Sequence, residues 1–175
     1  MSAFRDIDIA ELPENPFALL GGEWMLVAAG DERGFNMMSA SGGFFGELWD
    51  RHIAVTVVRP QRYTFEFLQR HEMFSLSFFG ADKSVHKVCG HQSGRDVDKA
   101  AATGLIPVFS DGTVYFEQAR LVLLCRKLYV QALEEACFVN PELCGRFYPE
   151  CDYHVAFFGG IERALLAGQP PGARG

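Results

Sequence analysis

The chain has 175 residues, of which 49% are hydrophobic and 13% aromatic, and its formal net charge is −6. This length and composition exclude a disordered chain, and we expect a single domain over residues 1–175 with its core at about residues 20–167. The acidic balance argues against nucleic acid or an anionic membrane surface as the main partner, because both require a basic face.

The cysteines and the N-terminus bear on the compartment. The chain has five Cys, and its acidic start lacks the basic and apolar segments of a secretory signal. We therefore expect an intracellular, cytoplasmic protein with free thiols and without membrane spans. Cys137, Cys144 and Cys151 recur every seven residues. Zinc sites use more closely spaced cysteine pairs, so we predict no metal site. We interpret His154 as a hydrogen-bonded core histidine.

The first forty residues predict an arm and a hairpin. Residues 1–16 are acidic and contain two prolines, which predicts an extended arm or a flexible terminus. The apolar run at 24–29 predicts a strand, the glycine-bounded segment 30–34 a turn, and 36–41 the returning strand.

The next segment predicts a loop and then a buried strand. Gly42, Gly43 and Gly46 interrupt the pattern and favour a loop at this point. Residues 53–58 are apolar and rich in β-branched side chains, which predicts a strand buried on both faces.

Pro60 ends that strand, and the chain then predicts a helix and a further strand. Thr64 can cap a helix that runs to Arg70. Residues 74–79 alternate serine with larger apolar side chains, which predicts a strand. Short helices are predicted at 82–89 and 95–102, followed by a strand at 105–109 and a turn at 110–112.

The second half is predicted to be largely strand. The apolar run that begins at Leu121 predicts a long central strand, although its periodicity also allows a helix. The remaining predictions are a helical segment at 140–146, a last strand at 153–161, a helical turn at 162–167 and a disordered tail at 168–175. Many short strands with a few short helices predict a mainly β fold, closed or partly closed into a barrel.

Small polar side chains gather in the returning strand. A flavin ring needs hydrogen-bonding groups along its polar edge and apolar contacts on its faces. The segment offers polar groups from Asn36, Ser39 and Ser41, and apolar groups from Met37, Met38 and the nearby Phe44. A half-exposed strand with its polar residues in solvent is the alternative.

Two later segments offer groups that bind phosphate. Phosphate favours helix N-termini, hydroxyls and arginine forks. The first segment holds Arg59, Arg62, Tyr63 and Thr64 at a predicted helix start, and the second holds Ser93 and Lys99 around the start of the helix predicted at 95–102. A surface loop with ordinary arginines is the alternative for the first segment. For the second it is a charged helix start in which Asp96 and Asp98 complement the helix dipole.

Together these segments resemble the flavin reductase family with the FMN-binding split-barrel fold, in particular its flavoredoxin-like branch. The matching segments follow the family's order between residues 24 and 161. They are WMLVAAG at 24–30, NMMSAS at 36–41, GELW at 46–49, VVRPQRYT at 57–64, FSLSFF at 74–79, SGRDVDK at 93–99, CRKLY at 125–129 and DYHVAFFGGI at 152–161.

The resemblance implies a split β-barrel of Greek-key type, mainly β with short helices. It implies a homodimer that binds FMN non-covalently near the interface, and transfer of electrons from NAD(P)H to flavin or to a redox partner protein. It also implies the roles of the site residues. Asn36, Met37, Met38, Ser39, Ala40 and Ser41 line the flavin ring, and Arg59, Arg62, Tyr63 and Thr64 serve the phosphate and ribityl chain, with Ser93 and Lys99 nearby.

The chain departs from the family pattern N-x-M-T-A-S-W-G-G at three positions. Ser39 replaces the threonine, Gly42 the tryptophan and Phe44 the second glycine, and Leu124 stands where the family has a glutamate. The leading hypothesis is an FMN-dependent oxidoreductase of the flavin reductase type. The alternatives are a non-enzymatic FMN-binding electron carrier or sensor, and a structural protein without cofactor.

Overall fold

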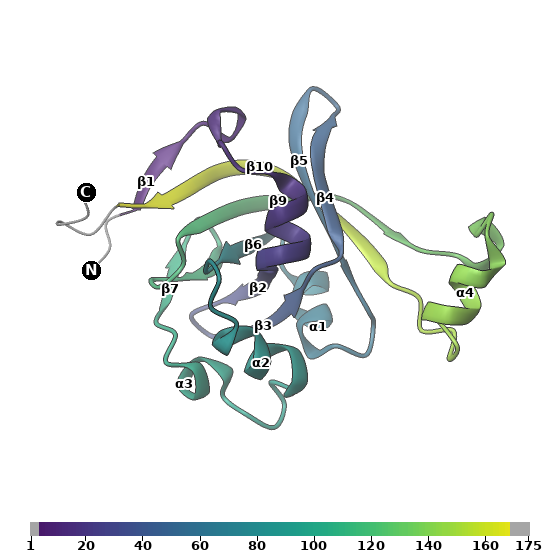
Figure 1. The fold of residues 1–175 in the computed structure, drawn as a ribbon. Helices are drawn as coiled ribbons and strands as arrows, with labels where there is room; N and C mark the ends of the chain where they lie inside the picture. The colour runs from purple at the N-terminus through teal and green to yellow at the C-terminus, as the bar shows by residue number, and fades with distance from the viewer. Residues whose placement is uncertain (1–3, 169–175) are drawn as a thin grey trace.

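The structure is a computed structural model and describes residues 4–168. Its elements are mostly antiparallel strands, with short helices between some of them (Figure 1). In chain order they are β1 (Phe4–Ile7), η1 (Ile9–Glu11), η2 (Ala18–Glu23), β2 (Met25–Asp31), β3 (Gly34–Ala40), β4 (Gly43–Leu48), β5 (Arg51–Val58), α1 (Tyr63–Arg70), β6 (Met73–Phe78), α2 (Ser84–His91), α3 (Lys99–Thr103), β7 (Pro107–Ser110), β8 (Thr113–Phe116), β9 (Leu121–Ala132), η3 (Glu135–Cys137), α4 (Pro141–Phe147) and β10 (Val155–Ala167).

The main sheet has eight antiparallel strands in the order β3-β2-β6-β9-β10-β5-β4, with β1 added to β10. Strand β10 pairs with β9 on one side, and on the other with β5 through its first half and β1 through its second. Strands β3 and β4 lie at the two ends of the order and share no ladder, so the barrel is open between them. This confirms the predicted mainly β, partly closed barrel.

Apolar side chains cover the sheet on both faces near its middle. The inner cluster includes Phe74, Phe78 and Phe157, all fully buried, with Leu68 of α1 packed against them. A second cluster lies under α2 and β8 and includes Met37 and Phe116. The strand predicted at 74–79 is confirmed as β6, and burial on both faces explains why its two serines are buried. Ser75 Oγ donates to the carbonyl of Val114 in β8 at 2.5 Å.

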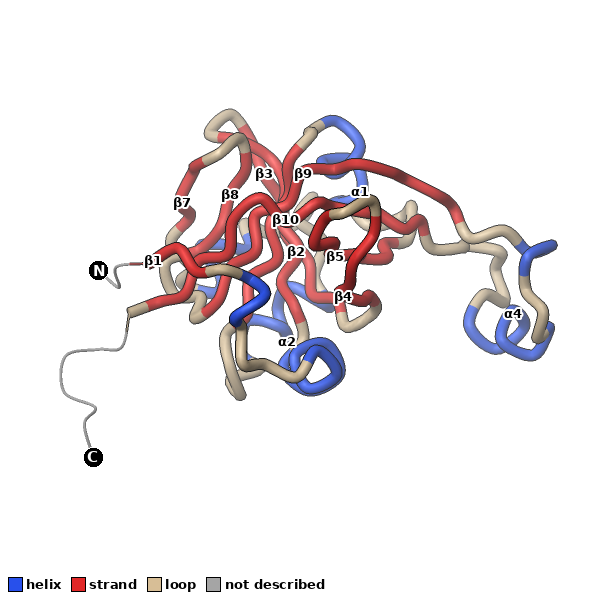
Figure 2. Tube along the Cα trace, turned by 90° about the horizontal axis from the view of Figure 1, so that it is seen from above, coloured by secondary structure: helices blue, strands red, loops and turns tan. Residues whose placement is uncertain are grey.

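Helices α1, α2 and α3 gather at the β3 end of the sheet (Figure 1). Strands β9 and β10 run on beyond the barrel as a two-stranded ribbon (Figures 1 and 2). The segment that joins them, residues 133–154, contains η3 and α4, and we call it the arm. None of the helices within residues 4–168 is long and apolar enough to cross a membrane.

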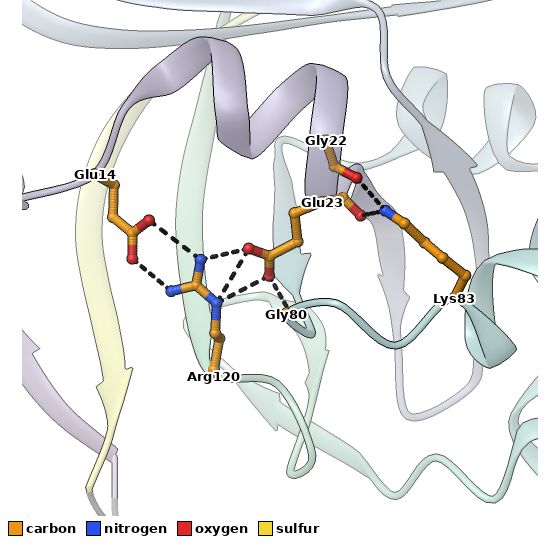
Figure 3. Close-up of polar contacts among 6 residues, drawn as sticks. All are labelled: Glu14, Gly22, Glu23, Gly80, Lys83 and Arg120. Atoms are coloured by element: carbon orange, nitrogen blue, oxygen red, sulfur yellow. Dashed lines mark hydrogen bonds and ion pairs between the residues drawn. The ribbon is translucent and has the colours of Figure 1, made fainter.

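A polar clamp ties the N-terminal segment to the residues just before α2 and β9 (Figure 3). The Arg120 guanidinium donates to the carboxylates of Glu14 and Glu23, and Glu23 also accepts the backbone N–H of Gly80. Lys83, the residue before α2, donates to the carbonyl oxygens of Gly22, at 2.5 Å, and Glu23. The clamp therefore joins the end of η2, the start of β9 and the start of α2, and so helps to set where α2 lies against β3.

Several elements differ from their predictions for identifiable reasons. Residues 43–48 form strand β4 rather than a loop, and the lack of a Cβ lets Gly43 approach the Val55 carbonyl, where a side chain would collide. Residues 162–167 continue β10 through a bulge, because β9 pairs with them; they are not helical. The N-terminal arm contributes β1, paired with the end of β10. The predicted tail beyond Gly168 lies outside the described residues.

The starts of α1 and α3 also differ from their predictions. Arg62, not Thr64, occupies the N-cap of α1, and Thr64 lies in the first turn. The predicted helix at 95–102 begins only at Lys99, because the Asp98 side chain accepts the N–H of Ala101 and acts as its cap. The helix at 140–146 is confirmed as α4, with Asn140 as its cap. The long strand from Leu121 is confirmed as β9, and the helical alternative is wrong.

Candidate functional site

Strand β3 forms one wall of a cleft because it is an end strand of the sheet. Its outer edge faces the end of β5 and the turn that follows, across a pocket of about 290 Å³. We call this the strand-edge pocket. It is lined by Met38, Ser39, Ala40, Ser41, Gly42, Val57, Arg59, Arg62 and His154.

A second pocket of about 180 Å³ adjoins the first at Met38 and Arg62. We call it the cationic pocket. It lies between the first turn of α1 and the segment that joins α2 to α3, and it is lined by Met38, Gln61, Arg62, Tyr63, Thr64, Cys89, His91, Gln92, Ser93, Gly94 and Lys99. Small-molecule sites usually hold about 300 Å³ or more, so these two pockets reach that size together rather than singly.

The cleft is positively charged although the protein is acidic. Arg59, Arg62 and Lys99 line it, and within the described part of the chain no Asp or Glu lines either pocket. Such a cleft favours an anionic ligand over a cationic one.

Lys99 is the most informative group in the cationic pocket. Its side chain is only 6% exposed, and Nζ donates to the carbonyl oxygens of Met37, at 2.8 Å, and Cys89, at 3.2 Å. An ammonium group has three N–H donors, so one is left after these two bonds. Burial lowers the pKa of Lys99, and the nearby Arg62 lowers it further. Within residues 4–168 no carboxylate pairs with Lys99 or Arg62. A bound anion would therefore supply the negative charge that these two cations lack.

The frame of this pocket is a buried contact between β3 and α1. Asn36 Nδ2 donates to Thr64 Oγ1 at 2.8 Å, and both side chains are buried. Gly94 packs against the Asn36 amide, where a Cβ would overlap Oδ1. Thr64 also lies in the first turn of α1, where backbone N–H groups have no partner within the helix. Asn36 thus holds a helix start and a loop against the strand, rather than lining either pocket of the cleft.

Two further residues predicted for the site, Tyr63 and Ser93, line the cationic pocket. Ser93 Oγ accepts the N–H of Arg95 at 3.2 Å, which leaves its own proton free to donate. The Tyr63 ring lies between the Arg95 guanidinium, 4.5 Å from its centre, and the Phe67 ring. These contacts fix Tyr63 and Ser93 at the pocket wall.

Arg59 lies at the strand-edge pocket and is engaged by the base of the arm. It pairs with the Asp152 carboxylate, donates to the Phe147 carbonyl at 2.8 Å and stacks over the Tyr148 ring. The ion pair lowers the pKa of Asp152. Arg59 does not line the cationic pocket, so the structure separates it from Thr64, Ser93 and Lys99, with which the sequence grouped it. It shares the strand-edge pocket with Arg62, which lines both pockets.

The structure also places two predicted ring contacts elsewhere. Met37 is 1% exposed in the cluster under α2, and only its carbonyl serves the cleft, through Lys99. Phe44 packs edge-on against Phe158 of β10 and does not line either pocket. The remaining members of the strand segment, from Met38 to Ser41, do line the strand-edge pocket.

Two histidines were missed as site residues. His154 lines the strand-edge pocket, and its Nδ1 lies 2.8 Å from the Tyr148 hydroxyl; burial lowers its pKa. His86 of α2 lies 2.9 Å from Ser39 Oγ through Nδ1. Neither carries a local sequence signal, because both contacts depend on how the arm and α2 fold back onto the barrel.

The cleft can hold a ligand that is polar along one edge and anionic at one end. No protein-family model matches the chain, and no curated protein matches it. Solved structures do match. An FMN-binding domain of a flavin reductase-like enzyme from Shewanella baltica matches 95% of this chain and 78% of its own, at 18% identity and a TM-score of 0.68.

The fold is the split barrel of flavin reductase-like proteins. A flavoredoxin from Methanosarcina acetivorans shares the split barrel over 84% of this chain and 69% of its own, with 21% identity and a TM-score of 0.65. An NADH:FAD oxidoreductase from Streptomyces globisporus, in complex with NAD and FAD fragments, shares it over 87% of each chain, with 14% identity and a TM-score of 0.60. At these identities the comparisons establish the split-barrel fold, which confirms the predicted architecture.

Proposed function

We propose that this chain binds FMN in the cleft and acts as an oxidoreductase of the flavin reductase type. The observation that carries the proposal is Lys99, a buried cation that shares a pocket with Arg62. No Asp or Glu of residues 4–168 lines that pocket. A phosphate satisfies both cations, the free N–H groups of the α1 start and the Ser93 hydroxyl. The split-barrel fold, seen in FMN-binding proteins, supports the choice of a flavin phosphate.

The residues present fit both ends of FMN. Arg62, Thr64, Ser93 and Lys99 hold the phosphate in the cationic pocket. The edge of β3 from Met38 to Ser41 offers backbone groups and hydroxyls to the polar edge of the ring. When bound, the flavin supplies the redox chemistry, taking electrons from a nicotinamide and passing them on. The protein contributes binding, orientation and exclusion of water.

Binding of two flavins to the purified protein tests this assignment. Riboflavin has the ring but lacks the phosphate, so FMN is expected to bind at least about tenfold more tightly, as charge-assisted hydrogen bonds imply. Equal affinities for FMN and riboflavin would contradict the phosphate site. Failure to bind either flavin would remove the proposed function altogether.

An FMN-binding electron carrier is the second candidate, favoured by the similarity of fold to a flavoredoxin. A carrier receives electrons from a redox partner protein, whereas a reductase takes them from NAD(P)H. Steady-state oxidation of NADH and NADPH with FMN present separates the two. Turnover with either nicotinamide supports the reductase, and tight FMN binding without turnover supports the carrier.

We also propose a homodimer. Phe44, Trp49 and Tyr129 are about half exposed and form one aromatic group around Phe158, beside the unpaired edge of β4. Exposed apolar groups of this kind commonly mark protein interfaces. Sedimentation equilibrium of the purified protein tests the proposal, with a monomer at micromolar concentration as the contrary result.

A further inference from the structure

Ser39 lies at the wall of the strand-edge pocket with its side chain held by α2. Its Oγ is 2.9 Å from His86 Nδ1 and 3.3 Å from the His86 carbonyl oxygen. Gly90, one helical turn further along α2, also lies close to this side chain: a Cβ added at Gly90 would be in van der Waals contact with Ser39. One residue, His86, therefore supplies every hydrogen bond that Ser39 Oγ makes within residues 4–168.

The imidazole of His86 is neutral at pH 7. Its side chain is 1% exposed, and burial lowers its pKa to about 4, with the nearby Lys83 acting in the same direction and Glu23 and Asp82 opposing it. A neutral imidazole carries a single N–H, on Nδ1 or on Nε2. The position of that proton decides what Ser39 can offer to a ligand.

The surroundings of His86 favour the proton on Nδ1. Nε2 is buried and makes no hydrogen bond within residues 4–168. The rings of Trp24 and Phe79 pack edge-to-face with the imidazole, with centroids 5.8 and 6.2 Å away. Buried donors without an acceptor are rarer than buried acceptors without a donor. With the proton on Nδ1, the imidazole donates to Ser39 Oγ.

Ser39 then keeps its own proton for another acceptor. The His86 carbonyl at 3.3 Å is a long and weak partner for a hydroxyl, so an acceptor in the strand-edge pocket can compete for that proton. We infer that His86 is a positioning residue that presents the Ser39 hydroxyl as a hydrogen-bond donor to the polar edge of a flavin ring. The inference rests on the proposed FMN site and adds a named donor and the group that orients it.

A double-mutant cycle on the full-length chain tests the inference, with riboflavin as the probe because it lacks the phosphate. Ser39→Ala and His86→Leu are each expected to weaken riboflavin binding about threefold to tenfold, the range for one neutral hydrogen bond. If His86 acts through Ser39, His86→Leu has no further effect in the Ser39→Ala background. Additive losses, or no loss in Ser39→Ala, overturn the inference.

A conservative variant separates positioning from packing. The Asn side chain in His86→Asn can place an amide N–H near the position of Nδ1–H, so it is expected to restore riboflavin affinity to within about twofold of wild type. The visible absorption band of bound FMN is expected to shift alike in Ser39→Ala and His86→Leu and to return in His86→Asn. A band unchanged in all three variants overturns the inference.

The proton position is measurable without any flavin. A long-range ¹H–¹⁵N NMR spectrum of the free protein is expected to show His86 protonated at Nδ1 at pH 7, and protonation at Nε2 overturns the inference. If the wild-type protein binds FMN but the double-mutant cycle gives a contrary result, only the inference about Ser39 and His86 is overturned. Wild-type protein that binds neither FMN nor riboflavin overturns the proposed function as well.

Discussion

Asn36 and Thr64 form a buried hydrogen bond of 2.8 Å that ties the end strand of the sheet to the first turn of α1. These residues are 28 positions apart in the chain, and the bond sets one side of the cationic pocket. The pocket therefore depends on a polar contact between two side chains that the sequence predicts as separate ligand groups.

Thr64→Val keeps the shape of this side chain but removes the acceptor. Asn36 Nδ2 is then left buried without a partner, which we expect to lower the free energy of unfolding by about 1–3 kcal/mol. Urea unfolding followed by circular dichroism measures the change. Thr64→Ser, which retains Oγ, is the matched control and should lose less. A Thr64→Val protein as stable as Thr64→Ser would show that the bond contributes little.

Gly94→Ala places a methyl group on the Asn36 amide. We expect a loss of about 1–3 kcal/mol of unfolding free energy, as for other overpacked positions, and weaker FMN binding. In the Asn36→Ala background the collision is absent, so the added cost of Gly94→Ala should fall close to zero.

Gly145→Ala serves as the control for that experiment, because a Cβ at Gly145 in α4 meets nothing within 4 Å. It should be neutral or slightly stabilising. If Gly94→Ala costs the same with and without Asn36, the close packing of Gly94 on the amide is not the cause.

Lys99→Met removes the buried cation and keeps the length and apolar stem of the side chain. FMN affinity should fall about tenfold to a hundredfold, because a hydrogen bond to a charged group is lost, whereas riboflavin affinity should stay within about twofold. Fluorescence titration with both flavins measures the two constants. Lys87→Met, at an exposed position on α2, is the control and should change neither. An equal loss for both flavins in Lys99→Met would indicate general damage to the cleft.

His86 predicts a dependence of stability on pH. A histidine in the unfolded chain takes up a proton near pH 6.5, whereas the buried His86 has a pKa of about 4. Between these values the unfolded state binds more protons, so stability falls as the pH is lowered through this window. The full effect is about 3 kcal/mol. Between pH 7 and pH 5, His86→Asn should lose about 2 kcal/mol less than wild type, and equal losses in urea unfolding would contradict this.

Arg120→Met removes the centre of the N-terminal clamp (Figure 3). The carboxylates of Glu14 and Glu23 then lose their cationic partner, and the largely buried Glu23 keeps only the N–H of Gly80. We expect a loss of about 1–3 kcal/mol of unfolding free energy, the cost of an unsatisfied polar group. Arg126→Met is the control, since Arg126 is more exposed, and it should cost at most about 1 kcal/mol. Equal effects of the two variants would argue against a special role for the clamp.

Local patterns in the sequence were sufficient to predict most strands of the sheet. The apolar runs of β2, β5 and β9 and the glycine-bounded turn before β3 are short-range features, and the structure confirms them. The local pattern failed where pairing overrides it. The glycines of β4 suggest a loop, but this segment pairs with β5 and is extended. The sequence at the end of β10 suggests a helical turn, but pairing with β9 and β1 keeps it extended.

The sequence by itself determined the order of the segments that form the cleft and the chemistry they carry: small polar groups on β3, then arginines and hydroxyls at α1, then Ser93 and Lys99. The tertiary structure decided which of these groups meet. It paired Arg59 with Asp152, 93 residues away, turned Lys99 onto the Met37 carbonyl, and set His86 behind Ser39. The reason is physical: these contacts depend on burial and on charges brought together across the fold, and neither quantity is present in a local stretch of sequence.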